Sequence, residues 1–374
     1  MNSGSQRRVP LAIPFLSGSE AANVQRAVES TWISSNGKFL KSFEEEFPKV
    51  AGTDHALAVS NGTVALHLSL LALGAGPGDE VIVPSMTYIA TANTVRYVGA
   101  EPVFVDVDPT TWCIDVDQVE AAVTDRTVGI IPVDLYGHPA DYDQLEVLAR
   151  KHGIWILEDA AEAPFATYKG RPAGSFGVAS TFSFYGNKVL TSGEGGAVAS
   201  SDTDLVARMR QIRGQGMDPE RRYYFPIMGH NFRLTNVAAA ILCGQLENQS
   251  TILANRRQVY SWYDEELKGL PGISLQPRAD WAELSPWLYS VLITEESAIS
   301  RDGLASSLEE KGVETRPFFV PIHSLPPYAS SRALDMTETD RLARQGVNLP
   351  THPALTRDDV AYVAECLREA SRGA

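Results

Sequence analysis

The chain has 374 residues, 44% of them hydrophobic, and carries a formal net charge of −14. Its size is typical of a globular protein with more than one domain, and its acidic balance argues against a nucleic-acid partner. Because we find neither a metal-binding cysteine pattern, nor a signal sequence, nor the ~18 apolar residues of a membrane span, we expect a cytoplasmic protein with no metal site and no membrane contact.

The first 200 residues alternate between short apolar runs and amphipathic stretches. The apolar runs predict strands at 56–59, 80–84, 102–108, 129–135, 154–159, 180–184 and 196–199. The amphipathic stretches predict helices at 40–50, 64–71, 117–123, 143–152 and 202–212. Such alternation is typical of an α/β fold with a mostly parallel, doubly wound sheet.

A different pattern begins near residue 236. Residues 236–268 predict one or two long helices. Strands near 289–294 and 313–316 and helices near 301–311 and 358–371 are predicted after them. We therefore expect two domains, a large one over residues 1–250 and a smaller α+β domain over residues 251–374.

One lysine is unusual in its surroundings. Lys188 follows the apolar run 180–184 in a glycine-rich turn, and the next acidic residue is Glu194. A lysine amine removed from water has a lowered pKa and can form a Schiff base with an aldehyde. The alternative is a solvated lysine in a surface loop, and the turn alone does not decide between the two.

Two adjacent carboxylates, Glu158 and Asp159, end another predicted strand. A carboxylate at the C-terminal end of a parallel strand points into the ligand crevice of an α/β sheet. Pyridoxal phosphate needs such a carboxylate to keep its ring nitrogen protonated. An aspartate in this place can also cap the following helix. The sequence leaves open which of the two acids faces a ligand.

A third stretch has the properties of an anion site. Residues 60–63, Ser-Asn-Gly-Thr, join a predicted strand to a predicted helix, where free backbone N–H groups can bind a phosphate. The alternative is a simple helix cap. Neither a Walker loop nor a G-x-G-x-x-G pattern follows a strand here, so nucleotide hydrolysis and dinucleotide redox chemistry lose support.

Residues 158–163 (E-D-A-A-E-A) and 183–196 (S-F-x-x-x-K-x-x-x-x-G-E-G-G) together resemble the DegT/StrS family of nucleotide-sugar aminotransferases. The resemblance runs nearly end to end, from residues 14–18 to residues 348–353. Residues 185–188, 214–219 and 231–236 are closest to the branch that makes 4-amino-4,6-dideoxysugars, such as perosamine synthases. The resemblance implies an aspartate-aminotransferase-like fold (fold type I) with pyridoxal 5'-phosphate as cofactor.

The resemblance also implies roles for individual residues around the cofactor. Lys188 would be the catalytic lysine that bonds to the cofactor, and Asp159 would face the ring nitrogen. The other cofactor-binding positions would be Gly62, Thr63 and Ser183 at the phosphate, Tyr88 on the ring face, Glu162 beside the cofactor, and Asn231 at the cofactor phosphate of a neighbouring subunit. For Tyr88, packing in the core is the alternative.

The family resemblance further implies a homodimer with shared active sites. Residues that would lie near the substrate are Trp32, Ser34, Arg222, Tyr223 and His323. The alternatives are an ordinary turn around Trp32, a flexible surface loop over residues 214–236, and a structural role for His323.

We therefore expect transfer of an amino group from L-glutamate to C4 of a nucleoside-diphosphate 4-keto-6-deoxyhexose. Lys188 favours transamination over dehydration, because related dehydratases carry histidine at this position. Amination at C3, amination of a keto-cyclitol, and a catalytically silent regulator with the same fold remain as alternatives. The nucleotide could be dTDP, GDP or UDP.

Overall fold

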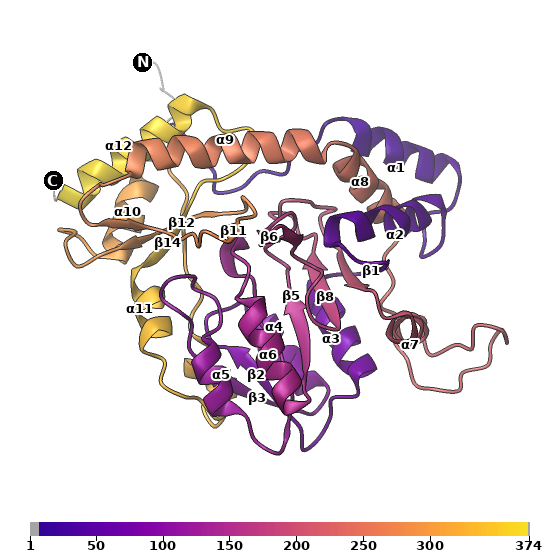
Figure 1. Cartoon of the computed structure of the whole chain (residues 1–374). Coiled ribbons are helices and arrows are strands. Elements are labelled where there is room, and N and C mark those ends of the chain that lie inside the picture. Colours follow the sequence, from indigo (N-terminus) through magenta and orange to yellow (C-terminus); the bar gives the residue numbers. More distant parts are fainter. Residues whose placement is uncertain (1–6, 373–374) are drawn as a thin grey trace.

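Figure 1 shows the chain as a computed structural model, which describes residues 7–372. Its centre is a seven-stranded sheet. In spatial order the strands are β1 (His55–Val59), β9 (Gly196–Ser200), β8 (Ala179–Ser183), β5 (Trp155–Asp159), β4 (Thr127–Ile130), β2 (Glu80–Pro84) and β3 (Glu101–Val105). Strand β9 is antiparallel to both of its neighbours and the other pairs are parallel, so the predicted mostly parallel α/β sheet is confirmed.

Helices cover both faces of this sheet. One core lies between the sheet and helices α2 (Lys38–Ala51), α5 (Val116–Ala122) and α6 (Tyr142–His152). A second core lies between the other face and helices α3 (Gly62–Leu73), α4 (Ala90–Tyr97) and α7 (Thr203–Arg213). Successive strand residues contribute to opposite cores, because side chains alternate across a strand.

The predicted strand at 129–135 is too long. Strand β4 ends at Ile130, and residues Leu135–Gly137 form a short 3-10 turn (η1). Pro132 has no N–H group to donate to a strand ladder, and Tyr136 has a positive φ of 49°, which no strand residue adopts. The chain therefore bends over the end of the sheet, next to Asp159.

A second sheet is built from strands that all follow residue 250. It is antiparallel, in the order β10 (Ile273–Leu275), β12 (Tyr289–Ile293), β14 (Gly346–Leu349) and β13 (Arg316–Pro317). Helices α9 (Gln249–Leu267), α10 (Arg301–Glu310) and α12 (Arg357–Arg372) share a core with it. The predicted strand at 313–316 is shifted, since Val313 makes only an isolated bridge to Val9.

The remaining elements connect the two sheets. A small sheet joins β6 (Thr167–Tyr168) to β7 (Arg171–Pro172) and, from beyond residue 250, to β11 (Ala282–Glu283). The other elements of this part are η2 (Ile322–Ser324), η3 (Pro326–Tyr328) and α11 (Thr337–Gln345). Leu334 donates its N–H to Phe104 in β3, so this late segment packs along the first sheet.

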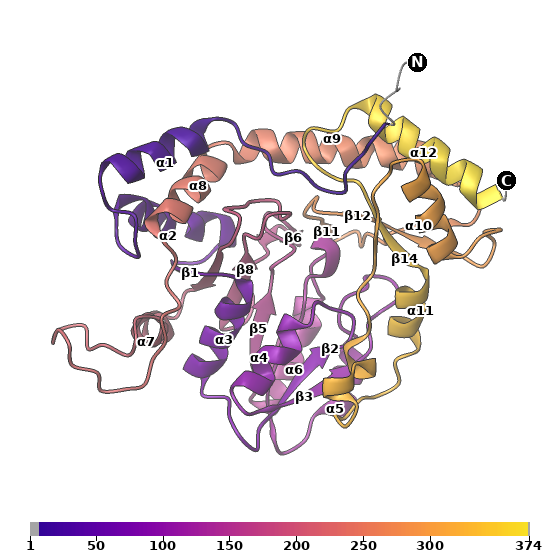
Figure 2. The same ribbon diagram turned by 180° about the vertical axis from the view of Figure 1, so that it is seen from behind.

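Two features lie at one end of the molecule. Helix α8 (Asn236–Glu247) packs with both α1 (Ser19–Glu29) and α2, and α9 runs from it towards α12. Figure 2 shows that the loop between α7 and α8 extends away from the body as an arm. We use the name "arm" for residues 214–235. Within residues 7–372 we find no helix of the length and apolarity that spanning a lipid bilayer requires.

Candidate active site

The structure separates the two carboxylates that end strand β5. Ile156 and Glu158 face the core shared with α6, whereas Leu157 and Asp159 face the side of α3 and α4. Glu158 accepts hydrogen bonds from the N–H groups of Gly174 (2.6 Å) and Phe176 (3.0 Å). Asp159 is therefore the acid that lies on the same face as the N-terminus of α3.

Asp159 is buried and held in place from α4. Its Oδ2 accepts a hydrogen bond from the Thr91 hydroxyl at 2.9 Å, and its Oδ1 accepts one from the Ala161 N–H at 3.2 Å. The first of these bonds fixes the direction of the carboxylate, because Thr91 lies in the first turn of a helix that packs on strand β2. Burial raises the pKa of Asp159, while Thr91 and the charge of Lys188 oppose this.

Lys188 lies in the turn after strand β8, and its side chain is only 12% exposed. Its Nζ is 3.7 Å from Oε1 of Glu162 and 3.7 Å from the centre of the Trp287 ring. Burial lowers the pKa of the amine, while the charges of Glu162 and Asp159 oppose this. A lysine with a lowered pKa is a better nucleophile and base at neutral pH. The prediction of a desolvated lysine therefore agrees with its position.

Glu162 completes this group. Its Oε2 accepts a hydrogen bond from the Tyr136 N–H at 2.8 Å, at the bend over the end of the sheet. Burial raises the pKa of Glu162, and the charge of Lys188 opposes this. Burial thus favours the neutral forms of all three groups, Lys188, Asp159 and Glu162.

The N-terminus of α3 provides the anion cradle predicted from residues 60–63. The Asn61 side chain caps the helix by accepting from the Val64 N–H at 2.9 Å. In the described part of the chain, the N–H groups of Gly62 and Thr63 donate to no acceptor. A Cβ atom on Gly62 would lie 2.9 Å from Cβ of Ser183, so only glycine allows strand β8 to approach this closely. Two N–H groups and the Ser183 hydroxyl therefore face one small space.

These residues fit pyridoxal 5'-phosphate. The free N–H groups at α3 suit its phosphate, Asp159 suits its protonated ring nitrogen, and Lys188 suits its aldehyde. Asp159 and Ser183 end neighbouring parallel strands, so the acid and the cradle lie at the same edge of the sheet. We propose these contacts for the cofactor.

Two further predicted residues lie beside this group. Tyr88 precedes the helix that carries Thr91; its ring is 59% exposed and lies 5.9 Å from that of Phe319. An exposed ring at this place is available to a ligand, whereas core packing would bury it. His323 is half-buried, and its Nδ1 shares a hydrogen bond with the Ser85 hydroxyl at 2.8 Å. His323 is thereby joined to the same loop as Tyr88.

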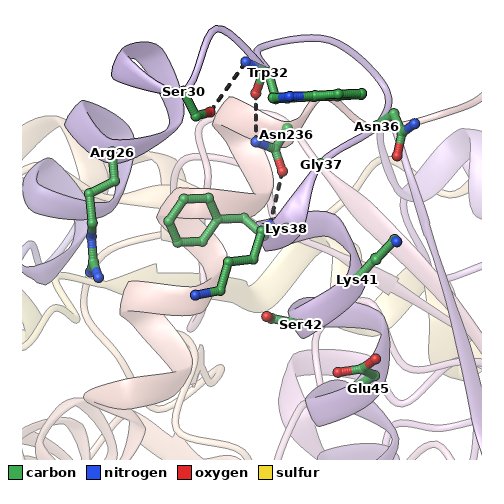
Figure 3. A pocket seen from close by; sticks show the side chains of 11 residues that line it. Arg26, Ser30, Trp32, Asn36, Gly37, Lys38, Lys41, Ser42, Glu45 and Asn236 are labelled. Atoms are coloured by element: carbon green, nitrogen blue, oxygen red, sulfur yellow. Dashed lines mark hydrogen bonds between the residues drawn. The ribbon is translucent and has the colours of Figure 1, made fainter.

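The other predicted residues are not gathered around Lys188. Trp32 and Ser34 lie in the loop between α1 and α2, where Asn236 binds their carbonyl groups through its side chain (2.6 Å) and its N–H (2.6 Å). This loop borders a cavity of about 690 Å³ that Figure 3 shows between α1 and α2. None of the groups around Lys188 lines that cavity, so the cavity is separate from the lysine site.

Three predicted residues lie on the exposed arm. Arg222 stacks on the Tyr223 ring at 4.8 Å and donates to its hydroxyl at 3.1 Å. Asn231 accepts from Arg233 at 3.2 Å. Arg222 and Tyr223 lie within the arm, whereas Asn231 lies at its base, where it pairs with Gly214 at the end of α7.

Sequence reasoning missed two contacts of this site. Thr91 lies in the stretch from which only Tyr88 was predicted, although a hydroxyl in the first turn of a helix is a plausible partner for a carboxylate. Trp287 follows Asn187 by 100 residues, and no local pattern links the two. Residues 7–372 contain no group of three or more histidine, cysteine, aspartate or glutamate side chains that could hold a metal.

Comparison with known proteins places this site in a family. Residues 15–368 match the DegT/DnrJ/EryC1/StrS aminotransferase family. The chain is 47% identical over 366 residues to GDP-perosamine synthase from Caulobacter vibrioides, covering 96% of this chain and 97% of that protein.

Solved structures agree with this match. A structure of S. venezuelae DesV in complex with a ketimine intermediate is 38% identical, with a TM-score of 0.88 and coverage of 96% of this chain and 98% of that one. DesI, crystallised in the presence of its TDP-sugar product, is 37% identical, with a TM-score of 0.90 and coverage of 97% and 93%. The chain therefore belongs to the DegT/DnrJ/EryC1/StrS aminotransferase family, whose enzymes use pyridoxal 5'-phosphate.

Proposed function

We propose that this aminotransferase moves an amino group from L-glutamate to C4 of a 4-keto-6-deoxyhexose carried on a nucleoside diphosphate. The observation that carries the proposal is a desolvated lysine beside two buried carboxylates and next to an anion cradle. The 47% identical relative, which is named for GDP-perosamine, supports the C4 position and a GDP-linked sugar. The DesI structure, with its TDP-sugar, keeps dTDP as the second nucleotide to test.

The bound cofactor supplies an electron sink and carries the amino group between the two substrates. The chain's own residues hold it and move protons. In this proposal Gly62, Thr63 and Ser183 bind its phosphate, and Asp159 accepts the hydrogen bond of its ring nitrogen. Lys188 would act as the base that takes the proton from Cα of L-glutamate and as the acid that returns it.

The reaction balances without a further reactant. L-Glutamate gives up its amino group and leaves as 2-oxoglutarate, and the keto sugar becomes the amino sugar. In the second half Lys188 moves the proton in the opposite direction, towards the carbon that was the ketone. A single buried base serves both halves, which requires that the amine be neutral in one step and charged in the next.

We further propose a homodimer in which the arm of each subunit enters the site of the other. Large apolar side chains of the arm are exposed to an unusual degree, and Met228 and Tyr223 reach 88% and 72%. Asn231 would then meet the cofactor phosphate of the neighbouring subunit, and Arg222 and Tyr223 would lie near its substrate. Trp32, Ser34 and His323 remain proposed substrate contacts within a subunit.

Two coarser assignments accompany this proposal. We place the large domain at residues 1–250 and the small one at 251–374. This boundary falls at the second residue of α9, and every strand of the second sheet follows it. We also propose a cytoplasmic location, where nucleotide sugars and glutamate would both be at hand.

The first experiment is an absorption spectrum of the purified protein with pyridoxal 5'-phosphate, before and after addition of L-glutamate. We expect a yellow protein that bleaches as 2-oxoglutarate appears. GDP- or dTDP-linked 4-keto-6-deoxyhexose should then restore the colour and yield a 4-amino sugar identifiable by NMR. Lys188→Ala should remain folded, as measured by circular dichroism. Its rate of amino transfer should fall at least ~10²-fold, because a general base contributes this much.

Other outcomes would replace the proposal. A product aminated at C3, or turnover with a free keto-cyclitol and none with a sugar nucleotide, would change the substrate but not the cofactor chemistry. A protein that stays colourless with the cofactor would exclude the enzyme, and a Lys188→Ala protein with full turnover would exclude the mechanism.

A further inference from the structure

The amine of Lys188 has an aromatic neighbour for which the proposed chemistry assigns no task. Nζ lies 3.7 Å from the centre of the Trp287 ring, well within the ~6 Å over which a ring face attracts a cation. The distance from Nζ to Oε1 of Glu162 is also 3.7 Å. Trp287 itself is 2% exposed, so the contact is shielded from water and correspondingly strong.

Trp287 is attached to the same stretch of backbone as the lysine. Its indole N–H donates a hydrogen bond to the carbonyl of Asn187 at 2.9 Å, and Asn187 directly precedes Lys188. The ring therefore cannot move along the Lys188 side chain without breaking a buried bond. The ring also stacks near that of Tyr136, with ring centres 6.2 Å apart, and the Tyr136 N–H donates a hydrogen bond to Glu162.

A buried arginine fixes the backbone of Trp287. Arg256 is 2% exposed, and one of its terminal nitrogens donates to the carbonyls of Pro286 (3.2 Å), Trp287 (2.9 Å) and Thr351 (3.4 Å). Burial lowers the pKa of Arg256 to about 10, and the charge of Tyr260 opposes this. All three hydrogen bonds come from one nitrogen and go to carbonyl groups, while the buried Nε has no partner among the described residues; together the three bonds favour one geometry of these backbone segments.

The chemistry of transamination gives such a ring a purpose. The amine needs a favourable place when it carries a proton and is not bonded to the cofactor. A carboxylate can provide attraction but can also accept the proton, whereas an aromatic ring attracts the ammonium and cannot accept it. A ring beside Glu162 therefore holds the charged lysine near the cofactor without competing for its proton.

We propose that Trp287 is a positioning residue for Lys188, whose indole face holds the free ammonium of the lysine beside Glu162 between the two half-reactions. This inference rests on the proposed transamination for its purpose, but the contact itself belongs to the chain. This role also explains why Trp287, which follows residue 250, is hydrogen-bonded to the turn that carries Lys188.

The test separates this role from simple packing by the direction in which a Trp287 substitution shifts the pH midpoint of Lys188 labelling. In the cofactor-free protein, the amine of Lys188 is labelled with acetic anhydride across a pH series, and its peptide is quantified by mass spectrometry. If Trp287 only excludes water, Trp287→Leu admits water and raises the pH midpoint of labelling. If the ring holds the ammonium, Trp287→Leu lowers that midpoint, and Trp287→Phe, which retains a ring face, lies between Leu and the wild type.

Steady-state kinetics provides the second readout. We expect Trp287→Leu to lower kcat about tenfold with little change in KM for L-glutamate, because the base and not substrate binding is displaced. Trp281→Phe is the matched control, since Trp281 packs on His138 and Tyr168 and not on the lysine. It should leave the labelling midpoint and kcat unchanged.

A raised or unchanged midpoint in Trp287→Leu would overturn the inference, whatever the sugar substrate proves to be. A lowered midpoint in a protein that aminates no keto sugar would leave the inference standing and remove the proposed function. Circular dichroism and thermal melting of each variant verify that the labelled protein is folded.

Discussion

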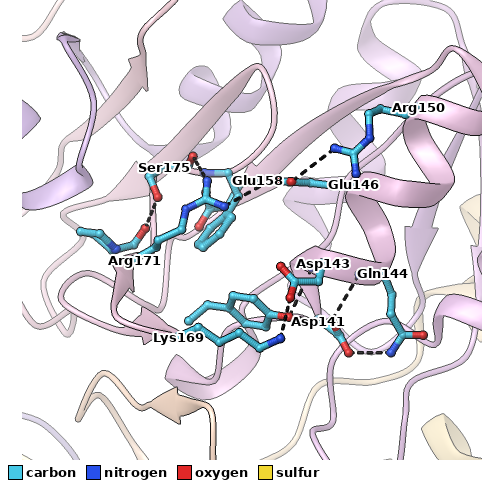
Figure 4. A network of polar contacts seen from close by, with 12 residues as sticks. Asp141, Asp143, Gln144, Glu146, Arg150, Glu158, Lys169, Arg171 and Ser175 are labelled. Carbon is cyan, nitrogen blue, oxygen red and sulfur yellow. Dashed lines mark hydrogen bonds and ion pairs between the residues drawn. The ribbon is translucent and has the colours of Figure 1, made fainter.

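At the scale of single residues, the position of a carboxylate on its strand decides its chemistry. Asp159 faces Thr91 and Lys188, while its neighbour Glu158 faces the opposite core. On that opposite side Glu158 meets Asp134, and both are buried. No cation of the described chain neutralises this pair. Figure 4 shows Arg171, on the hairpin beside Glu158, directed instead to Glu146 (3.6 Å) and to the carbonyl of Ser175 (3.3 Å).

Asp134 therefore makes the stability of the protein depend on pH. Burial raises its pKa to about 7, against hydrogen bonds from Tyr142 (2.7 Å) and Ala140 (3.0 Å) that lower it. The folded-state pKa of Asp134 lies above the unfolded value near 4. Its contribution to the free energy of unfolding is therefore fully present below pH 4 and is lost as the pH rises through 7. Burial, and then Asp134, raise the pKa of Glu158 in the same direction.

We expect Asp134→Asn to reduce this dependence, because an asparagine still accepts both hydrogen bonds but does not ionise. In urea unfolding, the loss of unfolding free energy between pH 5 and pH 8 should shrink by on the order of 2 kcal/mol. Asp143→Asn is the control, since Asp143 is exposed and paired with Lys169, which lowers its pKa. An equal pH dependence in wild type and Asp134→Asn would contradict the assignment.

At the scale of elements, one side chain ties the loop between α1 and α2 to α8. Asn236 is 1% exposed; its amide donates to the Trp32 carbonyl and its Oδ1 accepts from the N–H groups of Phe39 (3.0 Å) and Leu40 (3.2 Å). A Cβ atom on Gly37 would lie 2.4 Å from this side chain, so the loop passes it as closely as glycine permits. Figure 3 shows Asn236 between the two ends of the loop.

We expect Asn236→Ala to destabilise the protein by about 2–3 kcal/mol, because three backbone groups lose a buried partner. Denaturant unfolding measures this loss. Asn36→Ala is the matched control: Asn36 is exposed in the same loop, and its side chain forms no hydrogen bond within residues 7–372. Equal stability of the two variants would show that the loop is held by other contacts.

At the scale of the whole molecule, the exposed arm supports the proposal that a second copy completes the site of each chain. The arm extends away from the body between its two ends, Asn231 lies at its base, and the large apolar side chains Tyr223 and Met228 are exposed. An exposed apolar patch of this kind marks an association surface. In a twofold dimer each arm would contribute to the other subunit's site, and each subunit would receive the same contribution.

Shared sites predict that two inactive variants restore each other. Lys188→Ala retains Asn231, and Asn231→Ala retains Lys188, so a mixed dimer contains one intact site. Co-expression with two different tags should recover about a quarter of the wild-type activity, because half of randomly formed dimers are mixed and each has one working site. Light scattering verifies the dimer. Recovery of no activity, with a mixed dimer isolated, would place Asn231 in the site of its own subunit.

The sequence by itself determined most of the elements and the kind of chemistry. Strands and helices follow from local periodicity, and the motifs around Asp159 and Lys188 identified the cofactor that the family comparison then supported. Errors occurred where a turn interrupts an apolar run, as in the strand predicted over residues 129–135, which contains Pro132 and is followed directly by Tyr136. The bend at that point depends on a proline and on a positive φ, which hydrophobic periodicity does not reveal.

Only the tertiary structure decided how these residues meet. Alternation along β5 is visible in the sequence, but which of Glu158 and Asp159 faces α4 depends on the packing of both sheet faces. The contact of Trp287 with Lys188 joins positions a hundred residues apart, through hydrogen bonds to backbone carbonyls. Any residue type has such a carbonyl, so a contact of this kind leaves no trace in a single sequence and is fixed only when the chain has folded.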